Sequence, residues 1–476
     1  MAKYSKATSV QAVKIPPTFR RGSVAAAMFV FAAACSDDVG GTSTPPPSVA
    51  ARNAPRAATV GVAFEYDAAQ AGATFDDAEL PFTYTITFPK GALGLTADGS
   101  TVSGTPNGIG IVSVRIDGED AFGRIATDTF SIAVFSASLT TPTLPLSLYN
   151  YSDATLPPHY TGASSVMPQH DNTPAGNPTT NAGVTLGRVL FYDKRLSIND
   201  QVACASCHLQ EFGFSDTALK SRGFAGGFTG RHSMGLSNAR YYQRGNAFWD
   251  ERAATLEAQA LKPIADPVEM GLPLADAVTK LSVTAYYRAL FTAAFGDSVV
   301  TTTRIARALA QFDRALVSHS SPFDAAYNGG ETFDAQLLTQ QQRDGLTVFQ
   351  NAGCSVCHMT MGQIASEPRN IGLDATVTDP GAGNGKFKVP SLRNIAVRAP
   401  YMHDARFATL MDVVNFYNAG VAANPFLDDA LRVSPGGAPR QLNLSLADKN
   451  ALVAFLQSLT DPAFLADVRF SNPFGN

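Results

Sequence analysis

The chain has 476 residues, 45% of them hydrophobic, which is enough for roughly two to four domains with packed cores. Its formal net charge is −4, and its 36 lysines and arginines are scattered along the chain instead of forming a basic cluster. This distribution gives no reason to expect nucleic acid binding.

The N-terminal 35 residues have the features of an export signal. Arg20 and Arg21 precede an apolar stretch at residues 24–34, which is too short to span a bilayer permanently. The stretch ends in Ala-Ala-Ala-Cys and resembles a bacterial lipobox, in which Cys35 would be acylated; ordinary cleavage before Cys35 is the alternative. A Gly, Ser, Thr and Pro tract within residues 36–55 reads as a tether. We expect a periplasmic protein that meets the membrane only through a lipid anchor.

Residues 56–136 predict a β-sandwich. Apolar and polar residues alternate at 112–116 and at 129–134, and residues 97–99 form a turn signal. Strands at this spacing suggest a small sandwich. The Val-Ser-Gly-Thr-Pro run at 102–106 and a later Asp-Ala-Phe-Gly resemble the Ig-like (cadherin-like) domains of bacterial surface proteins.

Helical periodicity begins near residue 183, after a linker rich in Pro, Ser, Thr and Asn at 137–182. Residues 303–318 place their apolar side chains on one helix face. Two capping boxes, at 409–412 and 445–448, start further helices. We expect a multidomain protein in which two mostly α-helical domains follow the β-sandwich. The parts are a signal peptide at 1–35, a tether at 36–55, an Ig-like domain at 56–136, a linker at 137–182 and two domains at 183–330 and 331–476.

Each helical domain carries one Cys-x-x-Cys-His motif, which is the attachment signal for c-type haem. Both thiols form thioethers with the haem, and the histidine binds the iron. A four-thiolate zinc site is the rival interpretation, but zinc does not explain a histidine directly after both pairs. The sequence therefore predicts two covalently bound haem c groups, at Cys204, Cys207 and His208 and at Cys354, Cys357 and His358.

The segment from about 183 to 460 resembles the bacterial di-haem cytochrome c peroxidase family, which includes the MauG-type enzymes. The matching stretches occur in the family's order: 186–193, the first haem motif, 248–253, 263–270, the second haem motif, 387–394 and 399–404. The resemblance implies two cytochrome c-like domains. The first haem would react with peroxide, and the second would relay electrons.

The resemblance also implies roles for three side chains of the first domain. Glu269 matches the catalytic glutamate, which moves a proton between the peroxide oxygens. Gln259 matches the glutamine that orients peroxide, and Trp249 matches the tryptophan between the haems. Taken alone, Glu269 would be a surface acid and Trp249 a core aromatic.

The first iron is expected to be five-coordinate and open. Classical members close it with a histidine on a mobile loop, but residues 221–230 contain none, and Phe224 falls at the expected position. His232 is an alternative ligand, and it replaces an asparagine that the family has near an interdomain calcium. Backbone carbonyls near Arg398 and Pro400 could still bind calcium.

Tyr417 is the predicted second ligand of the second iron, opposite His358. MauG-type enzymes have a tyrosine there, and a phenolate stabilises oxidised iron. Met402 and Met411 are alternatives, because classical peroxidases use a methionine. Ala352 stands where MauG-type enzymes have a tryptophan that oxidises a protein substrate, so maturation of a quinone cofactor by that route is not expected.

Three functions follow from these observations. The first is a peroxidase that reduces hydrogen peroxide to water with electrons from a small cytochrome c or another donor. The second is a MauG-like oxidase of a protein or organic substrate. The third is an electron-transfer cytochrome without catalytic activity, but a pure relay needs neither Glu269 nor Gln259.

Overall fold

The computed structural model describes residues 45–475, except 78–79, 153–154, 360 and 366. The export signal, the lipid attachment site Cys35 and the tether up to residue 44 lie outside the described residues. In the part that is described, no helix is long and apolar enough to cross a membrane.

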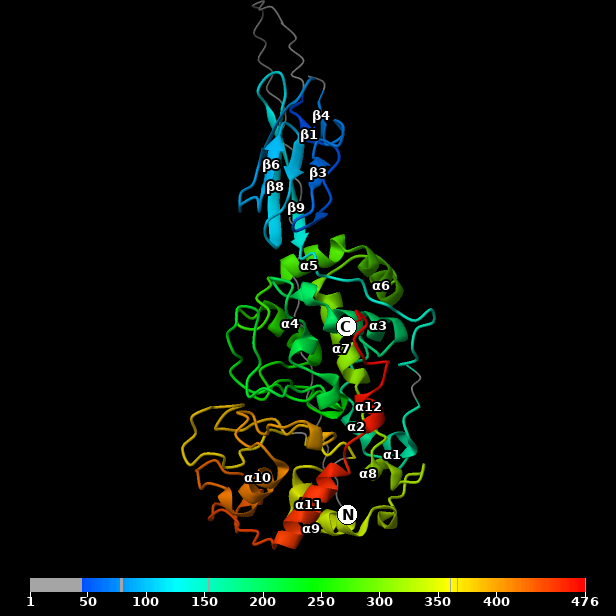
Figure 1. The fold of residues 1–476 in the computed structure, drawn as a ribbon, viewed down its shortest axis with the longest axis vertical. Helices are drawn as coiled ribbons and strands as arrows, with labels where there is room; N and C mark the ends of the chain where they lie inside the picture. Colours follow the sequence, from blue (N-terminus) through cyan, green and yellow to red (C-terminus); the bar gives the residue numbers. More distant parts are fainter. Residues whose placement is uncertain (1–44, 78–79, 153–154, 360, 366, 476) are drawn as a thin grey trace, which may run out of the picture. The chain divides into compact units, whose positions relative to one another are not determined.

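The N-terminal region is built of β-strands, coloured blue to cyan in Figure 1. One sheet has the order β2-β9-β8-β5, a second has β3-β7-β6, and β1 pairs with β4. Both larger sheets contribute to one hydrophobic core. The alternation predicted for two strands is confirmed, since Val112, Val114 and Ile116 of β8 and Phe130 and Ile132 of β9 are buried in it. The strands are β1 (Ser48–Val49), β2 (Arg56–Thr59), β3 (Phe64–Asp67), β4 (Phe75–Asp76), β5 (Thr83–Thr87), β6 (Leu95–Asp98), β7 (Thr101–Gly104), β8 (Gly110–Glu119) and β9 (Ile125–Phe135).

The β-region begins earlier than expected, inside the segment assigned to the tether. Strand β1 pairs with β4 in antiparallel register, with Ser48 opposite Asp76. The buried amide of Asn53 donates hydrogen bonds to the carbonyl of Ala68 and to the carboxylate of Asp128, both at 3.0 Å. Composition alone suggested a free tether, but these long-range pairings fix the segment to the sheets.

The expected linker at 137–182 is also packed. It contains two short helices, α1 (Pro158–Thr161) and α2 (Met167–His170). Tyr160 and Met167 are almost fully buried, and they form a cluster with residues of the helical part. The Tyr160 hydroxyl donates a hydrogen bond to the carbonyl of Ser318 at 3.0 Å. The segment is therefore a structural part of the helical region.

The rest of the chain is mainly helical, as predicted. Both capping boxes are present: Thr409 and Asp412 start α10, and Ser445 and Asp448 start α11. The helix expected at 303–318 ends at Ala315, three residues early, although Leu316 is buried as its apolar pattern requires. The longer helices are α3 (Asn181–Tyr192), α4 (Leu256–Ala265), α5 (Leu274–Val283), α6 (Ala285–Phe295), α7 (Thr302–Ala315), α9 (Gln340–Asn351), α10 (Leu410–Asn415) and α11 (Leu446–Gln457), and the short ones are α8 (Pro322–Ala325) and α12 (Pro462–Leu465).

The helices build two separate hydrophobic cores. One gathers residues of α3 to α7, and the other gathers residues of α8 to α11. The C-terminal segment does not follow the boundary placed at residue 330, because it returns to the first core (red in Figure 1). There Phe464 packs on Phe214, with ring centroids 5.8 Å apart, and Phe470 packs on Phe312 at 6.4 Å.

Candidate active site

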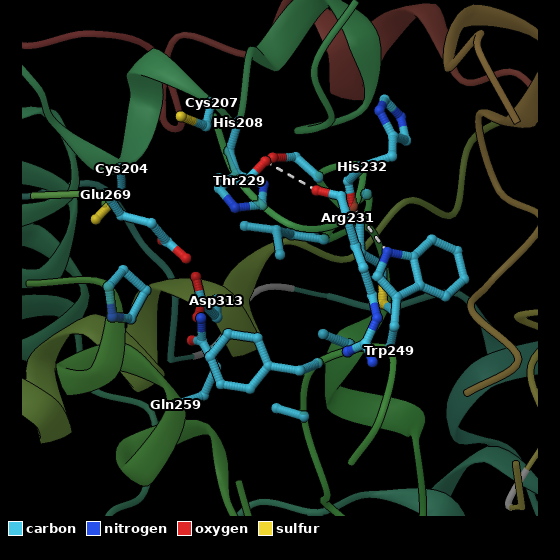
Figure 2. Close-up of a pocket in the computed structure, with 18 of the residues that line it drawn as sticks. Cys204, Cys207, His208, Thr229, Arg231, His232, Trp249, Gln259, Glu269 and Asp313 are labelled. Atoms are coloured by element: carbon cyan, nitrogen blue, oxygen red, sulfur yellow. Dashed lines mark hydrogen bonds between the residues drawn. The ribbon is translucent and has the colours of Figure 1, made fainter. Parts of the chain in front are cut away.

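A cavity of about 470 Å³ lies in the first helical core, and it brings together most of the predicted site residues. Cys204, which starts a short 3-10 helix, lines it with Cys207 and His208. Gln259 reaches it from α4, and Glu269 reaches it from the loop between α4 and α5. Figure 2 shows Gln259 and Glu269 together on one side of this cavity.

Both motif histidines have their Nδ1 atoms tied to backbone carbonyls. His208 donates a hydrogen bond from Nδ1 to the carbonyl of Phe214 at 2.8 Å, and His358 donates one to the carbonyl of Gln363 at 2.9 Å. This leaves the lone pair on Nε2, which is the arrangement that second-shell carbonyls give to metal-binding histidines. Burial lowers the pKa of His208, and it lowers the pKa of His358 to about 4, so both rings are neutral as ligation requires.

The cysteines fit haem attachment better than a zinc site. All four motif cysteines are free thiols. Cys204 and Cys207 line the first cavity, whereas Cys354 and Cys357 belong to the motif of His358, which lines another cavity. Among the residues that the structure describes, no group of three or more His, Cys, Asp and Glu side chains could hold a metal ion. In the described residues the four thiols are therefore not gathered into the single group that a four-thiolate zinc site needs.

Glu269 is a partly buried carboxylic acid that lines this cavity. Burial, aided by Asp266, raises the pKa of Glu269 above its usual 4.5, and Arg252 opposes this shift. Its backbone carbonyl accepts a hydrogen bond from the Phe224 amide at 3.0 Å, which fixes the loop. A carboxyl group with a raised pKa is suited to exchanging protons near neutral pH.

Asp313 is a lining residue that the sequence analysis missed. It lies on α7, only 6% of its surface is exposed, and Figure 2 shows its carboxyl group pointing toward Glu269 and Gln259. Burial raises the pKa of Asp313 to about 7. The only signal in the sequence was an acid between apolar residues of an amphipathic helix, and Arg314 beside it made an ordinary ion pair equally plausible.

Phe224, on the 221–230 loop, and His232, just after it, both have side chains held by other contacts. Phe224 does not line the cavity; a Cβ added to Gly271 would lie 2.4 Å from its ring, so the two residues are packed together. His232 donates a hydrogen bond from Nδ1 to Ala218 at 3.0 Å, and its Nε2 lies 3.4 Å from the Ser215 hydroxyl. Ser215 directly follows Phe214, whose carbonyl accepts the hydrogen bond from His208. Figure 2 shows His232 on the other side of the cavity from Glu269 and Gln259.

Trp249 lies at the boundary between the first cavity and a second one. It lines both, together with His232 and Lys388. Its indole Nε1 donates a hydrogen bond to the carbonyl of His232 at 2.8 Å, and its own carbonyl accepts one from the Lys388 amide at 2.8 Å. Trp249 can therefore be a packing residue and also lie between the two cavities.

The second cavity, of about 160 Å³, brings His358 and Tyr417 together. Tyr417 lies in a π-helical turn, Phe416–Gly420, and such turns are frequent at functional sites. Burial and the nearby thiols of Cys357 and Cys354 raise the pKa of Tyr417 well above its usual value. Met402 lines this cavity too, whereas Met411 does not.

The expected calcium ion stays a prediction. Arg398 and Pro400, whose carbonyls were the suggested ligands, both line the second cavity. The Arg398 side chain is buried there. A cation close to this guanidinium would be repelled.

Comparisons with known proteins agree with the two haem motifs. A family model described as di-haem cytochrome c peroxidase matches residues 181–332. Methylamine utilization protein MauG of Methylophilus methylotrophus is 33% identical over 297 residues, which are 60% of this chain and 84% of that protein. Cytochrome c551 peroxidase of Nitrosomonas europaea is 34% identical over 245 residues, 48% of this chain and 70% of that protein.

The fold gives the same result. The crystal structure of a MauG-like protein associated with microbial copper homeostasis is 34% identical, with a TM-score of 0.56 over 64% of this chain and 97% of that one. The prediction of an oxidoreductase of the cytochrome c peroxidase type is confirmed, and the family implies two c-type haems. A β-rich N-terminal region precedes the part with these motifs. The chain belongs to the di-haem cytochrome c peroxidase family, which includes the MauG proteins.

Proposed function

We propose that this protein is a peroxidase that reduces hydrogen peroxide to water with electrons from a small cytochrome c or a similar donor. One observation carries the proposal: Glu269 and Gln259 face the same cavity as His208, and no hydrogen bond within the described residues occupies either side-chain head group. The overall reaction joins one peroxide, two protons and two electrons to give two water molecules.

The side chains of the first cavity have distinct tasks in this reaction. Cys204, Cys207 and His208 would hold a haem, which would supply an iron centre suited to the two-electron reduction of peroxide. Glu269 takes the proton from the inner peroxide oxygen and delivers it to the outer oxygen, so that water can leave. Gln259 donates a hydrogen bond that holds the peroxide in line with this transfer.

Electrons would reach the first site from the second haem, held by Cys354, Cys357 and His358. Trp249 supports this route, because it lines both cavities and its indole can be oxidised. Tyr417 would also help to hold that haem through its phenol oxygen, since it lines the same cavity as His358.

We also propose a domain organisation for the exported protein. The two sheets with their common core form an Ig-like sandwich. Two haem domains follow it, with their boundary near residue 330, and the C-terminal tail packs on the first. The protein is exported to the periplasm, because c-type haem is attached outside the cytoplasm in bacteria. Cys35 carries the lipid anchor, because the residues before it resemble a lipobox.

MauG-like oxidation of a protein or organic substrate is the second candidate. The position of Tyr417 favours it, because a bound phenolate stabilises oxidised iron and makes the second haem a poor store of electrons. In that case the protein would hold the oxidising equivalents gained from peroxide until a protein or organic substrate supplies electrons.

Rapid mixing of the purified diferric protein with peroxide, with and without reduced cytochrome c, tests these candidates. Turnover that depends on cytochrome c supports the peroxidase. A long-lived oxidised state with slow turnover supports the MauG-like oxidase. Absence of any reaction with peroxide would contradict both and leave the electron-transfer cytochrome.

A further inference from the structure

Arg398 is a buried cation without an acidic partner. Only 5% of its surface is exposed. Its Nη2 donates a hydrogen bond to the carbonyl of Ser391 at 2.5 Å, but Nη1 is buried and has no hydrogen-bond partner. Among the ion pairs of the described residues, none includes Arg398.

Among the described residues, three other buried arginines, Arg195, Arg314 and Arg393, have acidic partners, whereas Arg188 is buried without one and does not line the second cavity. Arg393, five positions earlier, forms an ion pair with Asp324, and Arg314 pairs with Glu257 at 2.6 Å. A guanidinium is charged at neutral pH, and no acidic side chain of the described residues forms an ion pair with Arg398 to balance this charge.

The unpartnered guanidinium lies at the second cavity. Arg398 lines that cavity together with His358. A Cβ on Gly235 would lie 2.3 Å from Nη1, so the guanidinium packs closely against this glycine.

An isolated buried charge costs several kcal/mol, and proteins normally pair such charges. A planar guanidinium binds carboxylates especially well, because its N–H groups match the two carboxylate oxygens. Haem carries two carboxylates on its propionate side chains. We propose that Arg398 binds a propionate carboxylate of the second haem. This inference rests on haem attachment at Cys354 and Cys357, which is part of the proposed function.

Resonance Raman spectroscopy of the holoprotein tests this directly, because the bending modes of the propionate groups respond to their hydrogen bonds. In Arg398→Met we expect a shifted mode from one haem only. Loss of a nearby positive charge also disfavours the reduced iron. We expect the reduction equilibrium of the second haem to become about tenfold less favourable in Arg398→Met. This corresponds to a fall of about 59 mV in its midpoint potential for one electron, which spectroelectrochemistry can measure.

Two further variants separate charge from folding. Arg398→Lys keeps the positive charge but lacks the paired N–H groups of the guanidinium, so the propionate mode should shift by less than in Arg398→Met. If Arg398→Met does not fold, the result for Arg398→Lys tests the inference. Arg432→Met is the matched control, because Arg432 also donates to backbone carbonyls, those of Leu427, Gly437 and Asn424, but does not line the cavity. It should leave the propionate modes unchanged.

Unchanged propionate modes in both Arg398 variants would overturn the inference. So would a shift that replacement of chloride by another anion reproduces in the parent protein, because Arg398 would then bind an exchangeable anion. A protein without haem would contradict the proposed function as well. A haem-containing protein that does not react with peroxide would contradict the peroxidase alone and still test Arg398.

Discussion

The indole Nε1 of Trp249 donates a hydrogen bond to the backbone carbonyl of His232 at 2.8 Å, and both residues line both cavities. Trp249→Phe should keep most of the packing and lose this hydrogen bond, at a cost of about 1 kcal/mol in unfolding free energy. If Trp249 carries electrons, transfer from the second haem to the first should slow, because phenylalanine is harder to oxidise.

Rapid-mixing spectroscopy of the half-reduced protein measures this transfer. The reaction of the first haem with peroxide serves as an internal control, and it should be unchanged in Trp249→Phe. Equal rates of transfer in the parent and the variant would show that Trp249 is only a packing residue.

Glu269→Gln should lower the rate of the peroxide reaction by about 100- to 10,000-fold, the range typical of a lost general base. The pKa of Glu269 is raised above 4.5 by burial, and the carboxylate is the active form. The parent rate should therefore rise with pH through this raised pKa, and the variant should lack that rise.

Stopped-flow absorbance of the haem between pH 4 and 8 measures both effects. Glu211→Gln is the control, because Glu211 is an exposed acid close to the first haem motif and does not line the cavity. Parent-like rates in Glu269→Gln would remove Glu269 from the mechanism.

Asp313 should make the stability of the protein depend on pH. Burial raises the pKa of Asp313 from 3.8 to about 7, so the folded state holds this proton more tightly than the unfolded state. Its contribution is complete below about pH 4 and is lost as the pH rises toward 7, by no more than about 4 kcal/mol.

Denaturant unfolding of the holoprotein at several pH values detects this decline. Asp313→Asn should remove it, whereas Asp344→Asn, which changes an exposed acid on α9, should keep it. A decline that persists in Asp313→Asn would assign it to another group.

Tyr417→Met should raise the midpoint potential of the second haem, because a thioether favours reduced iron and a phenolate favours oxidised iron. Low-temperature EPR of the resting protein should show a changed second haem and an unchanged first haem. Met402→Leu is the matched control, since Met402 lines the same cavity. If Met402→Leu changes the ligation and Tyr417→Met does not, Met402 is the axial ligand.

Features that depend on close spacing were predictable from the sequence. Each haem motif occupies five consecutive residues, and each capping box spans four, so local geometry fixes how their side chains meet. The strands of the β-region followed from alternation, because one face of each is buried. The family's motif order then predicted Glu269, Gln259 and Trp249, all of which line the first cavity.

Other features depend on residues far apart in the chain, and only the tertiary structure decided them. The segment around Tyr160 read as a linker, yet it packs against residues more than 150 positions away. Phe470 returns to a core whose other members include residues of α3 to α7, far earlier in the chain. Asp313 and Arg398 looked like ordinary polar residues, since burial and missing partners are set by the neighbours that folding brings. The two haem motifs were readable from neighbouring residues, whereas folding decided which charged side chains line the two cavities.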